Sequence, residues 1–215
     1  MIILLIEQDQ REYDEKGLVP SEYEVEANGE FSGEIQEPIE LLKIRGRFDR
    51  VDRTVNHTRL RIVDYKVSMR RSFQADELDL VSKALQGRQL QPPLYSLMTP
   101  TTVQADAVRA QAAMHTTTSV DFRYLRPMQE VSVHAASFSG AIWDTATGEQ
   151  IRRTIHGWVQ GIRDGQFFIL PGTYCRHCQY ASACRFQHHS SWSRAYRLPL
   201  ARMYRQVRKQ KAVND

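Results

Sequence analysis

Residues 46–52 read Gly-Arg-Phe-Asp-Arg-Val-Asp, and residues 62–66 read Ile-Val-Asp-Tyr-Lys. Both runs lie in segments rich in β-branched and aromatic residues, with polar residues around Asn56 between them. This pattern predicts two strands, at 41–52 and 60–67, joined by a hairpin loop. An ionised carboxylate that faces a core without a partner costs several kcal/mol, so the aspartates inside these strands require partners.

Asp64 and Lys66 are two residues apart, so on a strand they project from the same face, whereas Tyr65 projects from the other. Two carboxylates from adjacent strands, Asp49 and Asp64, form with this lysine a compact oxygen-rich site suited to Mg²⁺ or Mn²⁺. The lysine of such a site can orient or deprotonate the attacking water, or stabilise charge that develops on a phosphate. We therefore predict a site for metal-assisted phosphate chemistry.

A surface ion pair is the alternative interpretation of Asp64 and Lys66, because aspartate and lysine two apart on a strand often pair in this way. The surrounding residues favour the metal site. Gly46 precedes Asp49 by three positions, the predicted hairpin follows, and a glutamine and a tyrosine lie downstream at positions 91 and 95.

The rest of the chain alternates between helix and strand signals. Residues 1–19 resemble the end of a helix that breaks at Gly17, and residues 21–27 alternate in polarity like a half-buried strand before a turn at Asn28 and Gly29. Further along we expect a helix at 76–86, a short helix that Pro92 and Pro93 begin, a loop with a weak helix at 99–118, strands at 120–125 and 131–142, and a helix at 151–162 that ends near Gly165. The pattern predicts an α/β fold.

The composition is that of an ordinary globular protein. Of 215 residues, 41% are hydrophobic and 25% are charged, which excludes collagen-like, low-complexity and wholly disordered chains. The apolar run 1–6 is too short for a signal peptide or a membrane span, so we expect a cytoplasmic protein without membrane contact. The net charge of +4 is compatible with a polyanionic partner.

Four runs, taken in order, resemble the RecB-like branch of the PD-(D/E)XK nucleases, which includes the AddB and RecB nuclease modules of bacterial helicase-nucleases. They are Gly-Arg-Phe-Asp-Arg-Val-Asp-Arg at 46–53, Ile-Val-Asp-Tyr-Lys at 62–66, Gln-Pro-Pro-Leu-Tyr at 91–95 and Cys-Arg-His-Cys-Gln-Tyr-Ala-Ser-Ala-Cys-Arg at 175–185. The resemblance covers about residues 17–186. It implies a restriction-endonuclease-like mixed sheet, with helices on both faces and a cysteine-ligated C-terminal appendage.

The resemblance also implies a role for each motif residue. Such proteins bind Mg²⁺ or Mn²⁺ through the two aspartates and a main-chain carbonyl, use the lysine in catalysis, and use the glutamine and tyrosine to support the site and contact DNA. In this sequence the residues are Asp49, Asp64, the carbonyl of Tyr65, Lys66, Gln91 and Tyr95. The implied activity is exonuclease or endonuclease hydrolysis of DNA phosphodiesters in repair or recombination, with a helicase subunit or an upstream helicase domain as partner.

Two features of such modules are missing from this sequence. They usually carry a metal-binding histidine on a helix before the first strand, but the first histidine here is His57. They also carry a cysteine well upstream of the nuclease core, whereas the first cysteine here is Cys175. We therefore expect the chain to be a C-terminal fragment of a longer protein, with weak activity of its own.

Glu24 lies where such proteins often have a glutamate. The alternative interpretation of Glu24 is a strand residue that faces solvent.

Cys175, Cys178 and Cys184 are the three cysteines of the chain. Three thiols within ten positions do not make the disulfide framework of a secreted protein, and they indicate a metal or cluster site. The resemblance makes them three of the four ligands of a [4Fe–4S] cluster, with the fourth from the upstream cysteine. His188 allows a second interpretation, because three thiolates and one imidazole form a common tetrahedral zinc site. Three unligated cysteines are the third interpretation.

The last segment, 190–215, is basic and interleaved with aromatic residues. Arginines such as Arg194 and Arg197, with aromatic residues between them, suit single-stranded nucleic acid, and a solvated helix face or a frayed terminus is equally compatible with the pattern. A nonhydrolytic DNA-binding module and a zinc-bearing nucleic-acid-binding domain are the alternative functions. We divide the chain into the end of an upstream helix (1–20), a nuclease core (21–170), a cysteine segment (171–189) and this tail.

Overall fold

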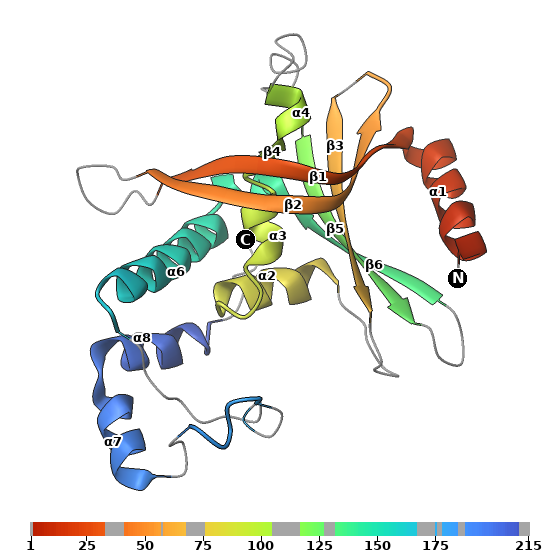
Figure 1. Ribbon diagram of the computed structural model, residues 1–215. Coiled ribbons are helices and arrows are strands. Elements are labelled where there is room, and N and C mark those ends of the chain that lie inside the picture. Colours follow the sequence, from red (N-terminus) through yellow and green to blue (C-terminus); the bar gives the residue numbers. More distant parts are fainter. Residues whose placement is uncertain are drawn as a thin grey trace.

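The structure is a computed structural model that describes residues 2–32, 41–56, 58–67, 76–104, 117–126, 132–166, 175, 178–184 and 188–210. Within these residues, six strands form one mixed sheet (Figure 1). They are β1 (Leu18–Ser32), β2 (Leu41–Thr54), β3 (Arg59–Val67), β4 (Met98–Pro100), β5 (Thr117–Arg126) and β6 (Ser132–Ser139). Their order across the sheet is β4-β1-β2-β3-β5-β6, and β3 with β5 is the parallel pair. The predicted α/β fold with a mixed sheet is confirmed.

Helices lie on both faces of this sheet. They are α1 (Ile2–Lys16), α2 (Glu77–Leu85), α3 (Gln91–Tyr95), α4 (Thr101–Gln104), the 3₁₀ helix η1 (Gly140–Asp144), α6 (Ala146–Arg163), α7 (His189–Arg197) and α8 (Pro199–Val207). Figure 1 shows α1 apart from α2, α3 and α6, which cluster on the other side. Within the described ranges, no helix combines the length with the hydrophobicity that a bilayer span requires.

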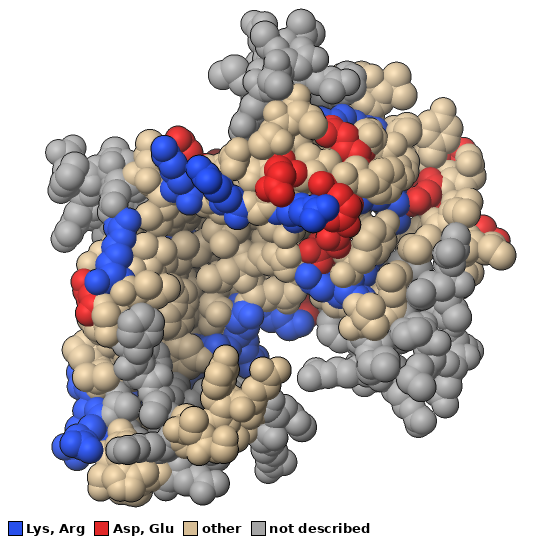
Figure 2. Space-filling model, in the orientation of Figure 1, with Lys and Arg blue, Asp and Glu red and all other residues tan. Residues whose placement is uncertain are grey.

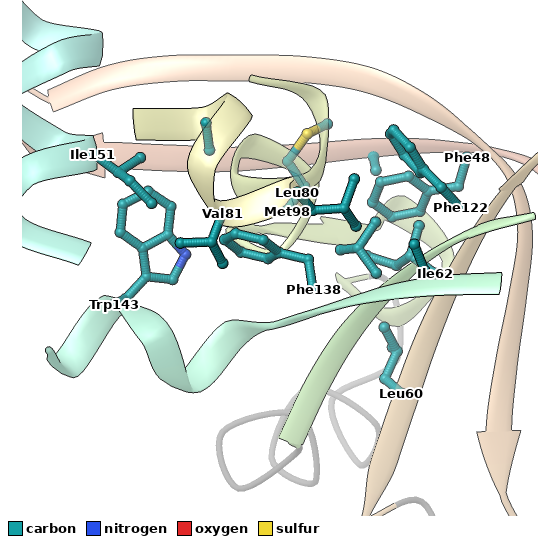
Figure 3. Close-up of a cluster of buried hydrophobic side chains, with 14 of the residues drawn as sticks. Phe48, Leu60, Ile62, Leu80, Val81, Met98, Phe122, Phe138, Trp143 and Ile151 are labelled. Carbon is teal, nitrogen blue, oxygen red and sulfur yellow. The ribbon is translucent and has the colours of Figure 1, made fainter. Parts of the chain in front are cut away.

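One face of the sheet carries the hydrophobic core (Figure 3). Alternate residues of β3 and β5 point into it, and α2 and α6 cover them with buried aliphatic side chains. The largest contributors include Ile62, Phe122, Leu80, Phe138 and Ile151, each fully buried. Because this face is continuous and apolar, its burial is the main stabilising contribution to the fold.

The opposite face is buried but charged, which the sequence did not lead us to expect. The strand residues that alternate with the core residues are largely arginines and aspartates, and α1 covers them with Asp9 and Glu12. Three arginines and four carboxylates meet there: Arg50, Arg61, Arg123, Asp9, Glu12, Asp52 and Asp121. We call this group the ionic cluster. It joins α1 to the sheet through charge pairs.

Several expected element boundaries are wrong. β4 lies at the start of the loop predicted at 99–118, and α6 begins at Ala146 rather than at 151. Two further differences have a clear cause. β1 runs through Asn28 and Gly29, where a turn was predicted, and pairs there with both β2 and β4. Glycine is required because a Cβ atom at Gly29 would lie 2.4 Å from the carbonyl oxygen of Leu97. β6 ends at Ser139, and not at 142, because the Ser139 hydroxyl accepts a hydrogen bond from the N–H of Ala141 and caps η1.

The C-terminal segment is not a frayed end over α8. Gly157 and Gly161 have no side chains, so other residues can approach the main chain of α6 at these positions. Met203 lies against Gly157, and Leu200 lies against Gly161. The ring of Tyr204 packs edge-on against Trp158, with centroids 5.0 Å apart. The part of the predicted tail that forms α8 is therefore packed on the body of the protein.

We expect Gly29→Ala to lower the free energy of unfolding by about 1–3 kcal/mol, because the new methyl group meets main-chain atoms that have no rotamer to change. Urea unfolding followed by circular dichroism measures this loss. Glu30→Ala, at the exposed next position of the same strand, is the control and should change stability little. Equal effects of the two substitutions would contradict the close approach of β1 to Leu97.

We expect Asp121→Asn to be tolerated at pH 7, whereas Asp52→Asn should cost about 3–5 kcal/mol. Asp52 is the carboxylate that pairs with both Arg50 and Arg61, and its neutralisation leaves these two buried guanidinium groups next to each other without the negative charge between them. Burial raises the pKa of Asp121, despite a hydrogen bond from Ser137 and the nearby Arg61. The ionic cluster contains four carboxyl groups and three arginines. Its net charge is therefore zero when one carboxyl group is protonated.

The sign of the Asp121 effect follows from its raised pKa. Below the unfolded-state pKa, near pH 4, the carboxyl group is protonated in both states and burial carries no charge penalty. As the pH rises through the folded-state pKa, the wild type loses this stability and Asp121→Asn does not. The stability of the variant relative to the wild type should therefore increase from pH 4 to pH 7 in urea unfolding, and a decrease would contradict this account.

Candidate active site

The candidate site lies where β2 and β3 separate. Their ladder runs from Arg53 opposite Leu60 to Arg50 opposite Val63 and then stops. The next residue on each strand at this end is one of the two predicted metal-binding aspartates. Beyond the ladder a side chain maintains the contact between the strands, because Asp49 Oδ2 accepts a hydrogen bond of 2.8 Å from the main-chain N–H of Tyr65.

Asp64 and Lys66 lie on the same face of β3, as the strand pattern predicted. Lys66 Nζ is 2.5 Å from Asp64 Oδ2, and Asp64 is only 3% exposed. Burial raises the pKa of Asp64, the Lys66 ammonium lowers it, and the negative charge of Asp49 raises it again, so that the pKa ends above its usual value. Asp64 is therefore a desolvated carboxylate held next to a cation.

Gln91 joins the aspartate, the lysine and Tyr95. Its amide nitrogen donates to Asp64 Oδ1 at 2.8 Å and to Tyr95 Oη at 2.7 Å, and its oxygen accepts from Lys66 Nζ at 2.9 Å. Gln91 and Tyr95 are four residues apart on α3, so they share one face of the helix. Pro92 and Pro93 begin this helix, as predicted, because proline is tolerated in a first turn.

Tyr95 connects α3 to β2. Its hydroxyl donates to the carbonyl oxygen of Arg47 at 2.9 Å, and its ring packs edge-on against Phe48 at 4.9 Å between centroids. Burial raises the pKa of Tyr95, so the phenol stays protonated and can act as a donor. The structure thus brings Gln91 and Tyr95 together with the aspartates.

Tyr65 projects from the other face, as expected from strand alternation. Its hydroxyl accepts a hydrogen bond of 3.0 Å from Arg50 Nη1 in the ionic cluster. Its main-chain carbonyl stays a predicted metal ligand.

The donor set fits a divalent cation of the Mg²⁺ type. Asp64 Oδ2 is buried and makes no hydrogen bond of good geometry, although the lysine ammonium lies close to it. Among the described residues, no three side chains of the carboxylate, histidine or cysteine type gather as a metal site. Mg²⁺ needs fewer protein ligands than that, because one or two carboxylates commonly hold it together with water and substrate phosphates.

Glu24 lies at the edge of this site. It faces Asp49 across the β1–β2 pair, since its neighbours Tyr23 and Val25 pair with Arg50 and Phe48. Its φ of 53° lies in the left-handed region, and its carboxylate is 2.9 Å from Arg47 Nη2. Glu24 is thus an exposed strand residue that pairs with this arginine, and a role for it in the site stays a prediction.

Charge of both signs follows the outer side of β1 and β2. Exposed Lys43 and Arg45 lie opposite Glu30 and Asn28. The space-filling view shows basic and acidic side chains mixed over this region (Figure 2). The approach to the site along these strands is therefore not uniformly basic.

The predicted C-terminal ligands are not gathered into a metal site within the described residues. Cys175 and Cys184 are half-buried, Cys178 is exposed, and none of the three forms a disulfide bond. His188 Nδ1 accepts a hydrogen bond from the main-chain N–H of Ser191 at 3.3 Å and lies 2.8 Å from its hydroxyl, which places it at the start of α7. The choice between iron and zinc stays a prediction.

Arg194 and Arg197 are exposed on α7. In Figure 1, α7 lies at the lower left, beyond α8 and far from the crossing of β2 and β3. The structure therefore does not bring these two arginines into the site of Asp49 and Asp64.

Comparison with known proteins identifies the family of the chain. The family model described as the PD-(D/E)XK nuclease superfamily matches residues 2–185. Curated proteins gave no match. Among solved structures, the chain is similar to one described as "Crystal structure of SSO0001", with 15% identity, coverage of 86% of this chain and 68% of that chain, and a TM-score of 0.39. The family match spans most of the chain, including all the residues of the site, and so the protein belongs to the PD-(D/E)XK nuclease superfamily.

Proposed function

We propose that the protein is a Mg²⁺-dependent nuclease that hydrolyses phosphodiester bonds in DNA. The superfamily consists in general of metal-dependent nucleases. The observation that carries the proposal is the meeting of Asp49, Asp64 and Lys66 at the end of the β2–β3 ladder. A pair of carboxylates beside a lysine matches what hydrolysis of a phosphodiester requires, namely cation binding and stabilisation of negative charge.

Asp49 and Asp64 would hold the cation, with Mn²⁺ as a substitute for Mg²⁺. When bound, a divalent cation supplies Lewis acidity toward the phosphate and lowers the pKa of a coordinated water. Lys66 places a positive charge and a proton donor beside Asp64, where charge develops during in-line attack on phosphorus. Lys66 would thereby orient or deprotonate the attacking water, or stabilise the negative charge that develops on the phosphate.

Gln91 positions the two charged groups of this site. Its single amide contacts Asp64 through nitrogen and Lys66 through oxygen, so neither side chain can rotate without breaking a hydrogen bond. Tyr95 in turn holds the Gln91 amide and is tied to β2. We assign Gln91 and Tyr95 to support of the site and, at its open side, to contact with DNA.

The finer parts of the proposal rest on the sequence resemblance. The order of the four motifs supports a RecB- or AddB-type module of a repair or recombination helicase-nuclease, with a helicase as partner. The net charge of +4 and the exposed Arg194 and Arg197 support a second contact with nucleic acid away from the site.

We expect Asp64→Asn and Lys66→Met each to reduce Mg²⁺-dependent cleavage by at least about 100-fold, because the first weakens a ligand of the cation and the second removes the positive charge beside the reacting phosphate. Single-turnover assays with excess protein on labelled single- and double-stranded DNA measure the rate. Asp164→Asn and Lys16→Met are the matched controls, since both side chains are exposed and lie outside the site. Circular dichroism checks that every variant is folded.

Wild-type cleavage by Asp64→Asn would refute the assignment. A wild-type chain that binds DNA but shows no cleavage above the Asp64→Asn level would favour the nonhydrolytic DNA-binding function instead. The helicase association is tested separately, by co-purification with the helicase encoded beside it, if one is present.

The metal content of the cysteine segment is also predictable. A [4Fe–4S] cluster usually takes four cysteine thiolates, and this chain has three cysteines. We expect the 215-residue chain, purified without oxygen, to contain zinc or no metal and to lack visible absorption. Metal analysis measures this content, with Cys178→Ser as the variant that removes a ligand.

If zinc is bound, the His188→Asn variant should lose the zinc and the His189→Asn variant should retain it. Stoichiometric iron and sulfide would contradict the prediction.

A further inference from the structure

Arg50 follows the candidate metal ligand Asp49 directly, yet its side chain lies in the ionic cluster on the other face of the sheet. The side chain is only 3% exposed. Its guanidinium has five N–H donors, and each has an acceptor. Two donate to Asp52, at 2.5 and 3.0 Å, two donate to Asp9, at 2.8 and 2.7 Å, and one donates to Tyr65 Oη at 3.0 Å. The side chain is therefore fixed in one orientation.

Two contacts tie β2 to β3 just where their ladder ends. On one side Asp49 accepts from the main-chain N–H of Tyr65, and on the other Arg50 donates to the Tyr65 hydroxyl. Both contacts join the residue pair 49–50 to Tyr65, which is the neighbour of Asp64. The distance between the two aspartates past the last ladder pair thus depends on side chains as well as on the main chain.

Helix α1 is the third member of this arrangement. Asp9 binds Arg50 through both carboxylate oxygens and also accepts from Arg123 Nη1 at 2.8 Å, so it connects β2 with β5. A bidentate pair between carboxylate and guanidinium fixes direction as well as distance. The position of α1 therefore determines, through Asp9, where the guanidinium group of Arg50 lies.

We propose that Arg50 is a positioning residue for the metal site, held by Asp9 of α1 and acting through Tyr65 to set the spacing of Asp49 and Asp64. We call Asp9, Arg50 and Tyr65 the Arg50 clamp. The proposal rests on the proposed function, because it assumes that the two aspartates hold a divalent cation. Its consequence is that metal affinity depends on a helix whose described side chains form no hydrogen bond or ion pair with Asp49 or Asp64.

Tyr65→Phe and Asp9→Asn test the clamp in the full chain. The first substitution removes one hydroxyl group and keeps the ring, and the second keeps the shape of the carboxyl group and removes its charge. Tyr13→Phe and Asp14→Asn are the matched controls, because they make the same chemical changes at exposed positions of α1. Mn²⁺ binding, followed by the electron paramagnetic resonance signal of free Mn²⁺ without DNA, gives a readout that does not depend on catalysis.

We expect each clamp variant to raise the dissociation constant for Mn²⁺ by about tenfold, the usual size of effect for residues that orient metal ligands. The controls should bind Mn²⁺ like the wild type. In cleavage assays the Mg²⁺ concentration for half-maximal rate should rise in parallel, with the KM for DNA unchanged. Thermal unfolding gives the melting temperature of each variant. All binding and cleavage measurements are made well below these temperatures, so that unfolding does not contribute.

Unchanged Mn²⁺ affinity in both clamp variants would overturn the clamp, even if their melting temperatures fall, because the contacts would then be structural only. A wild-type chain that binds no Mn²⁺ would overturn the proposed function and the clamp with it. Normal Mn²⁺ binding without cleavage would overturn only the nuclease activity, so the two failures are distinguishable.

Discussion

The separation of β2 from β3 after the Arg50–Val63 pair is the constraint on which the site depends. Each strand keeps a partner beyond this point, because β2 continues along β1 and β3 continues along β5. Near the gap, side chains bond two main-chain groups that would be costly to bury unpaired: Asp49 accepts from the N–H of Tyr65, and Tyr95 donates to the carbonyl oxygen of Arg47. It admits side chains between two strands, and this position lets Asp64 be buried while it faces the carboxylate of Asp49.

The two faces of the sheet stabilise the protein in different ways. Burial of the apolar face contributes favourably in proportion to its area, without requiring one arrangement of the helices. A buried ionic cluster adds little net stability, because desolvation of the charges offsets their attraction, but it penalises any arrangement that leaves a charge unpaired. In this protein the cluster specifies where α1 lies, and through Arg50 it reaches the residues of the site.

The correctly predicted parts of the protein depend on local spacing. The two strands around Asp49 and Asp64 and the short helix that Pro92 and Pro93 begin were predicted from residues close together in the chain. The ionic cluster was missed because charges that alternate with apolar residues are also the pattern of a solvent-facing strand. Nothing within β3 or β5 shows that a helix covers Arg61 and Arg123, since the covering residues are more than a hundred positions away from Arg123.

The two aspartates of the motif at 46–52 have different roles because the β2–β3 ladder ends between them. Asp52 is fully buried, and both of its oxygens accept hydrogen bonds from Arg50 and Arg61. Two guanidinium groups already neutralise this buried carboxylate, so a metal cation there would meet their positive charge. Asp49 lies beyond the ladder, where a single main-chain N–H is its bonded neighbour among the described residues and its remaining lone pairs are open. The end of the ladder therefore divides the motif. Arg50 and Asp52 lie within the ladder and bind other residues of the protein, whereas Asp49 lies just beyond it and is available to bind a cation.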